Sequence, residues 1–141
     1  MGSETRGRTA VGYFLRFALG AAFLSAVADR FGWWGPPGTP GVVWGAFEHF
    51  AAYTATLNPF VPTAAILALA WAVTVLEIVL GLFLLAGFRL KETALASALL
   101  LLAFAVAMAL FVGIKAPFDY SVFSASAGAC ALAVMARGGA G

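Results

Sequence analysis

Residues 63–88 read TAAILALAWAVTVLEIVLGLFLLAGF, an apolar run that contains a single charged residue, Glu77. A membrane-spanning helix needs about 20 consecutive apolar residues, so this run is long enough to cross a bilayer. A carboxylate near the middle of such a helix costs roughly 2.5–3.5 kcal/mol to insert. Intramembrane acids therefore face a bundle interior or a wet cavity, which makes Glu77 the first candidate for a functional residue.

The composition of the chain indicates an integral membrane protein. Of its 141 residues, 63% are hydrophobic and 10% are charged, whereas a soluble domain carries about 25% charged residues. The length predicts a single membrane domain, residues 1–141. The net charge of +2 is small and the basic residues are scattered along the chain, which argues against binding to nucleic acid.

The charged residues divide the chain into four predicted spans, at about 11–31, 63–88, 93–113 and 118–136. Short connections make sequential helices antiparallel neighbours, so the expected fold class is all-α, a polytopic four-transmembrane-helix bundle. Four spans place both termini on one side. The positive-inside rule assigns that side to the cytoplasm, since it holds most of the basic residues: Arg6, Arg8, Arg16, Arg89, Lys91 and Arg137.

The connection between the first two spans contains a further predicted helix. Residues 32–38, GWWGPPG, cannot form regular helix because glycine and proline interrupt them. Apolar positions then recur at spacings of three and four, which predicts a short amphipathic helix over about 42–57 on the outer bilayer surface. These positions are Val43, Phe47, Phe50, Thr54 and Leu57. The glycine-rich tail, 138–141, is expected to be disordered.

Two hypotheses describe Arg16, the basic residue within the first span. Its predicted depth differs from that of Glu77 by roughly 7 Å at 1.5 Å per residue, a gap that an arginine side chain can nearly bridge. Arg16 therefore either forms a buried ion pair with Glu77 or extends to the cytoplasmic headgroups.

Three residues are expected to share the helix face of Glu77. Thr74 lies three positions before it and Gly81 four after, with Trp71 a further turn outward. A carboxylate, a hydroxyl, a gap and an indole make a pocket for a flat redox headgroup such as a quinone. The same residues equally make a packed core that holds one satisfied acid.

Asp29 and Arg30 close the first span and are further candidates for ligand binding. The other polar residues of the outer end are expected to be solvated interfacial groups: Glu48, His49, Tyr53, Lys115, Asp119 and Tyr120. The chain has one cysteine and one histidine. It therefore has no intrachain disulfide, no second imidazole for a haem, and too few ligands for a dedicated zinc site.

The last span carries small residues on one face: Ser121, Ser124, Gly128 and Ala131. Membrane helices pack closely through such faces, so the first expectation is a seam within the bundle. The alternative is a seam with another membrane subunit or with a second copy of the chain.

Three stretches together resemble the DoxX family of small bacterial membrane proteins. They are LRFALG at 15–20, ADRFG at 28–32 and EIVLGLFLLAG at 77–87, followed by a basic turn. The resemblance extends from about Tyr13 to Met135. It implies a four-helix bundle in the bacterial inner membrane, with Arg16 and Glu77 at the family's intramembrane polar positions.

The namesake of the family resembles the membrane subunit of a thiosulfate:quinone oxidoreductase. Other members resemble partners of sulfurtransferases or of superoxide-detoxifying proteins. The resemblance thus implies a quinone-associated redox system, in which Glu77 exchanges a proton and Arg16 orients it. The lone Cys130 lies among apolar residues and offers no sulfur-handling centre. A non-catalytic accessory subunit of a larger membrane complex is the alternative function, and a small transporter is a third.

Overall fold

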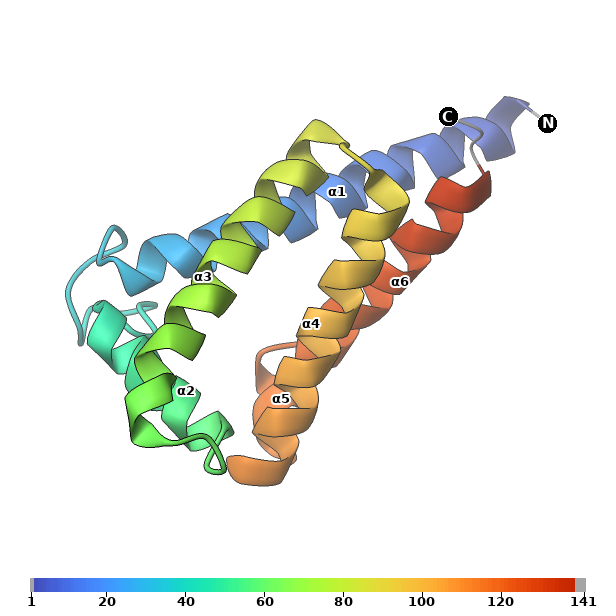
Figure 1. Ribbon diagram of the computed structural model, residues 1–141. Coiled ribbons are helices and arrows are strands. Elements are labelled where there is room, and N and C mark those ends of the chain that lie inside the picture. The colour runs from blue at the N-terminus through green and yellow to red at the C-terminus, as the bar shows by residue number, and fades with distance from the viewer. Residues whose placement is uncertain (1, 139–141) are drawn as a thin grey trace.

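The computed structural model describes residues 2–138, which form helices and connecting segments without a strand (Figure 1). The helices are α1 (Gly2–Arg30), α2 (Phe47–Leu57), α3 (Thr63–Ala86), α4 (Leu90–Phe111), α5 (Lys115–Asp119) and α6 (Val122–Gly138). The prediction of an all-α fold is confirmed. Three of these helices, α1, α3 and α4, are long and apolar enough to cross a membrane, and α6 is a shorter apolar helix.

Several boundaries differ from those expected. The first helix begins at Gly2 rather than near residue 11, and the surface helix begins at Phe47 rather than near residue 42. The predicted span at 118–136 is divided, because Lys115–Asp119 forms α5 and Ser121 has a φ of 55° before α6 starts. The tail expected at 138–141 lies outside the described residues except for Gly138, which ends α6.

Glycine ends both α1 and α3 in the same way. Gly32, with a φ of 76°, lets the amide of Trp33 reach back to the carbonyl of Ala28 at 3.0 Å. Gly87, with a φ of 73°, lets the amide of Phe88 reach back to the carbonyl of Phe83 at 3.0 Å. Both are Schellman motifs, which require a left-handed residue that glycine adopts without strain.

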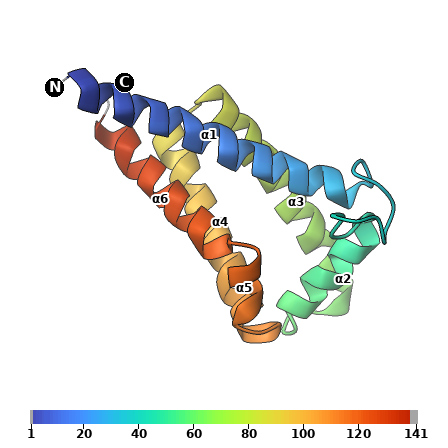
Figure 2. The ribbon, with the colours of Figure 1, turned by 180° about the vertical axis from the view of Figure 1, so that it is seen from behind.

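The long helices form two antiparallel pairs, α1 with α3 and α4 with α6 (Figures 1 and 2). The pairs meet at the end that holds the α3–α4 turn, and they diverge toward the end that holds α2 and α5. The expectation that sequential spans are antiparallel neighbours is confirmed for α1 with α3 and for α4 with α6, whereas α3 and α4 pack less extensively on each other. The divergence leaves room for a cavity among the helices.

Small residues bring the helices of each pair together. A Cβ atom on Gly20 would lie 3.0 Å from the carbonyl oxygen of Gly81, so α1 and α3 touch through their backbones. In the other pair, the Ser126 hydroxyl donates a hydrogen bond of 2.8 Å to the Ala98 carbonyl. Membrane helices associate through such close contacts.

The predicted small-residue face of the last span does not form this seam. The α6 residues that pack inward are Ser126, Ala129, Leu132 and Ala133. Ser121, Ser124 and Ala131 are exposed. The first expectation for that face is therefore wrong for these three residues, because α6 is rotated so that a neighbouring row of small residues meets α4. The fourth, Gly128, is half-buried beside Leu15 of α1.

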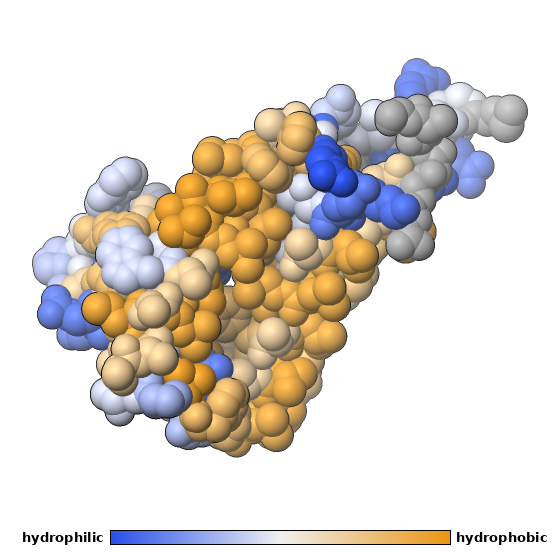
Figure 3. All heavy atoms as spheres, viewed as in Figure 1, coloured by the Kyte–Doolittle hydropathy of each residue, from blue (hydrophilic) through white to orange (hydrophobic). Residues whose placement is uncertain are grey.

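The outward faces of α3 and α4 are apolar, as Figure 3 shows. Large hydrophobic side chains on them are exposed, including Leu67, Val75 and Leu82 on α3 and Leu99 and Leu110 on α4. Hydrophilic residues gather near the α3–α4 turn and at the α2 end (Figure 3). An apolar belt between two polar ends is the surface expected of a protein in contact with a lipid bilayer.

Candidate functional site

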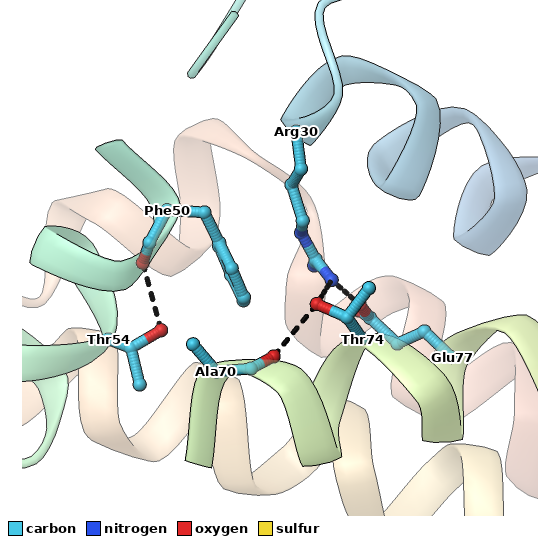
Figure 4. Close-up of polar contacts among 6 residues, drawn as sticks. All are labelled: Arg30, Phe50, Thr54, Ala70, Thr74 and Glu77. Atoms are coloured by element: carbon cyan, nitrogen blue, oxygen red, sulfur yellow. Dashed lines mark hydrogen bonds and ion pairs between the residues drawn. The ribbon is translucent and has the colours of Figure 1, made fainter. Parts of the chain in front are cut away.

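Arg30, the last residue of α1, forms an ion pair with Glu77 in the middle of α3 (Figure 4). Its Nη1 contacts Oε2 of Glu77 and donates a 3.0 Å hydrogen bond to Oγ1 of Thr74. Arg30 is 1% exposed and Glu77 is 4% exposed. A buried charge needs such a partner, and removing either one would leave the other unpaired.

Aromatic rings enclose the guanidinium of Arg30. Its Cζ lies 3.6 Å from the ring centroid of Phe50 and 5.2 Å from that of Trp44. Cations over aromatic faces gain electrostatic energy, more so when they are desolvated. The buried Nε of Arg30 makes no hydrogen bond to a described residue, so the group retains a free donor.

The predicted pair between Arg16 and Glu77 is wrong, for two geometric reasons. The antiparallel contact of Gly20 with Gly81 puts residue 24 level with Glu77, so Arg16 lies about 12 Å away along the helix. Helical side chains also lean toward the N-terminus of their own helix. Arg30 therefore leans back toward Glu77, whereas Arg16 leans away from it.

Arg16 instead caps the C-terminus of α3. Its Nε donates to the carbonyl of Leu84 at 3.1 Å, and its Nη2 donates to that of Leu85 at 3.0 Å. The ring of Tyr13 lies 4.9 Å from its Cζ. The last carbonyls of a helix lack intrahelical donors and carry partial negative charge, which a cation satisfies. The role of Arg16 is thus to hold α1 against the end of α3.

Asp29 is a structural residue as well. Its buried carboxylate accepts hydrogen bonds from the backbone amides of Val43 at 2.8 Å, Trp44 at 2.8 Å and Gly45 at 3.0 Å. These bonds fix the segment before α2 in a non-helical form, which explains why α2 starts late. They also place the indole of Trp44 over Arg30.

A cavity of about 570 Å³ opens beside the ion pair. Ligand pockets have volumes of about 300–1,000 Å³ and combine apolar walls with a few polar groups. The polar lining residues are Arg30, Glu77, His49, Tyr53, Thr56 and Tyr120. The apolar walls come largely from Trp44 and Phe50 and from Leu101, Phe104 and Met108 of α4.

Helix α2 contributes a polar stripe to this cavity. His49, Tyr53 and Thr56 follow at spacings of four and three, so they share one helix face. Nδ1 of His49 lies 3.0 Å from the Trp44 carbonyl. Because a carbonyl only accepts, Nδ1 carries the hydrogen, and Nε2 of the neutral ring is a free acceptor.

Tyr53 is held as a neutral hydrogen-bonding group. Burial raises the pKa of its phenol above the usual value, and the nearby Tyr120 raises this pKa further. Deprotonation would place a charge in a poorly hydrated position, which burial disfavours. Its hydroxyl is therefore available as a donor at physiological pH.

Three residues expected around Glu77 have other roles. Thr74 shares the face of Glu77 as predicted, yet its hydroxyl donates to the Ala70 carbonyl at 2.8 Å rather than to the carboxylate (Figure 4). Gly81 opens no gap, since α1 fills the space beside it. Trp71 is 45% exposed and stacks on Phe47 with ring centroids 4.3 Å apart.

The sequence reasoning missed the contribution of α2 to the site. His49 and Tyr120 are exposed, as expected of solvated groups, and Tyr53 is half-buried, but all three also line the cavity. The four-residue spacing of His49 and Tyr53 was the available signal. Lys115 and Asp119 do form an exposed pair, with Nζ 2.8 Å from Oδ2.

No group of three or more histidine, cysteine or acidic side chains that could hold a metal ion occurs within residues 2–138. Cys130 is exposed on α6. In comparisons with protein-family models, curated proteins and solved structures, nothing matches this chain. The cavity and its ion pair are thus the observations from which a function can be argued.

Proposed function

We propose that this chain is a DoxX-like membrane component of a quinone-linked redox system, which holds the quinone headgroup in the cavity beside Arg30 and Glu77. One observation carries the proposal: a buried ion pair forms part of the wall of an aromatic-lined cavity within apolar helices. Quinones dissolve in the bilayer and combine a flat apolar ring with polar oxygens. Apolar walls with a few placed polar groups suit such a ligand.

In this proposal, each lining residue has its own role in binding the headgroup. Arg30 donates a hydrogen bond to a headgroup oxygen through the donors that its contacts with Thr74 and Glu77 leave unused. Glu77 exchanges the proton that accompanies the change of redox state. Trp44 and Phe104 pack against the ring. A partner subunit supplies or removes the electrons.

The proposed topology has four spans, with α6 as the fourth and both termini in the cytoplasm of a bacterial inner membrane. The start of α1 and the end of α6 lie at the same end of the molecule (Figure 2). The N-terminal basic residues Arg6 and Arg8 are exposed there, and Arg89 and Lys91 are exposed at the α3–α4 turn. Clustering of basic residues on one side supports this orientation.

Mass spectrometry of lipids that copurify with the tagged protein tests the proposal. We expect near-stoichiometric quinone or quinol with the native chain and its loss in Glu77→Gln, because an uncharged glutamine no longer holds the guanidinium of Arg30 at the headgroup. Glu92→Gln is the matched control, because Glu92 is exposed in the first turn of α4. Circular dichroism establishes that each variant is folded. Retention of the ligand by a folded Glu77→Gln variant would contradict the proposal that the headgroup binds beside this ion pair.

A second candidate function is that of a non-catalytic accessory subunit. The observation that favours it is the exposed small-residue face of α6, where Ser121, Ser124 and Ala131 are left uncovered by the chain itself. Purification in mild detergent tests this function. A stable larger complex whose activity survives Glu77→Gln would support it over the quinone site.

A further inference from the structure

The ion pair presents a hydrogen-bond donor and an acceptor side by side. The Arg30 guanidinium has donors only, and its Nε is unused by the described residues. The Glu77 carboxylate has acceptors only, and its two oxygens offer more lone pairs than the contact with Arg30 occupies. Both residues line the cavity.

Helix α2 presents a second donor and acceptor. His49 offers Nε2 as an acceptor, because the Trp44 carbonyl holds its Nδ1–H. Tyr53, one helical turn further, offers a phenolic hydroxyl. The cavity is thus lined by two couples, each made of a hydrogen-bond donor and an acceptor: Arg30 with Glu77, and Tyr53 with His49.

A hydroxyl group satisfies each couple, because it donates one hydrogen bond and accepts others. A quinone carbonyl only accepts, so it would leave the Glu77 carboxylate or the His49 Nε2 without a donor. The Glu77 carboxylate is buried, so an oxygen left there without a donor loses its hydration, which is unfavourable. His49 is exposed, so its Nε2 gains a hydrogen bond from a hydroxyl without this penalty. On the basis of the proposed function, we infer that the cavity binds the reduced form, a quinol with two aromatic hydroxyls, more tightly than the quinone.

Equilibrium ultrafiltration with the full chain in detergent tests this selectivity. The probes are a decyl-substituted benzoquinol, kept reduced under anaerobic conditions, and the matching decyl-substituted benzoquinone. The tail and the ring substituents are shared, so the two probes differ only in the oxidation state of the headgroup, with hydroxyls on one and carbonyls on the other. We expect the dissociation constant of the quinol to be at least about tenfold lower, the size of one missing buried hydrogen-bond partner.

A variant of His49 isolates one couple without disturbing the ion pair. In His49→Asn the side-chain amide can still donate to the Trp44 carbonyl, but no atom remains at the position of Nε2. We expect the affinity for the quinol to fall more than the affinity for the quinone, because only a hydroxyl can donate to Nε2. Glu48→Gln is the matched control on α2, because Glu48 is exposed and does not line the cavity. It should change neither affinity.

The outcomes separate the inference from the proposed function. Equal affinities for the two probes, or a quinol preference that His49→Asn leaves intact, would overturn the inference while the quinone site stands. Failure of both probes to bind the folded native chain would overturn the proposed function as well.

Discussion

The ion pair between Arg30 and Glu77 should be strongly coupled, so that losing both charges is far less damaging than losing one. The perturbation is a double-mutant cycle of Arg30→Met, Glu77→Met and the combined variant. Methionine fills much of the volume of either side chain with a flexible apolar chain. Each single change leaves one charged group buried without its partner, at 1% exposure for Arg30 or 4% for Glu77.

The magnitudes follow from the burial of the pair. Removing one partner of a buried ion pair costs about 3–5 kcal/mol, whereas replacing both by apolar residues is often close to neutral. The double variant also loses the contact of Arg30 with Phe50, worth up to about 2 kcal/mol. Thr74 keeps its bond to the Ala70 carbonyl. The coupling energy should therefore be at least about 3 kcal/mol.

Reversible unfolding in mixed detergent micelles, followed by circular dichroism, measures all four free energies of unfolding. We expect the double variant to lie within about 2 kcal/mol of the native chain and both single variants to lie well below it. Additive losses, with the double variant as unstable as the sum of the single changes, would refute the reasoning that the two charges stabilise each other.

Three further predictions concern residues outside the pair. Arg16→Gln should lower the free energy of unfolding by about 1.5–3 kcal/mol, because two charged hydrogen bonds to the end of α3 are lost. The exposed Arg6→Gln should change it little, and equal losses in a thermal melt would contradict the capping role. Gly20→Leu should cost about 1–3 kcal/mol by forcing α1 from α3. Gly128→Ala, with ordinary contact at 3.4 Å, should be tolerated, and a reversed order in the same melt would disprove the close contact. Asp29→Asn should cost about 1–2 kcal/mol and speed proteolysis before α2, because its amide nitrogen cannot accept an amide hydrogen. An unchanged cleavage rate would count against this anchor.

Hydrophobic patterning was sufficient to predict the long apolar helices and α2, though not α5, and to single out Glu77 as a buried acid. It was insufficient to predict the partner of Glu77. Which residues of two packed helices lie at the same height depends on where the helices touch. The contact of Gly20 with Gly81 sets the relative height of α1 and α3, and the sequence does not show that these two glycines are in contact. The depths estimated from the predicted span ends placed Arg16 near Glu77. They placed Arg30 at the far end of the first span, away from Glu77.

The cavity was beyond prediction for a related reason. Its lining comes from residues far apart in the sequence, and it depends on the divergence of the two helix pairs. Periodicity places Phe50, Thr54 and Leu57 on the buried face of α2, as the structure bears out. The same periodicity cannot tell whether the adjacent row, His49 and Tyr53, faces water or a cavity. That distinction requires the positions of α4 and α5.

Asp29 and Arg30 are consecutive, and their Cα atoms lie about 3.8 Å apart. The first is tied to the amides of residues 43–45 and the second to Glu77. A single peptide unit thus joins the segment between α1 and α2 to the buried charge. While the three hydrogen bonds to Asp29 are kept, residues 43–45 and the end of α1 hold a fixed position relative to each other. The conformation of residues 43–45 and the burial of the Glu77 carboxylate therefore depend on the same end of one helix.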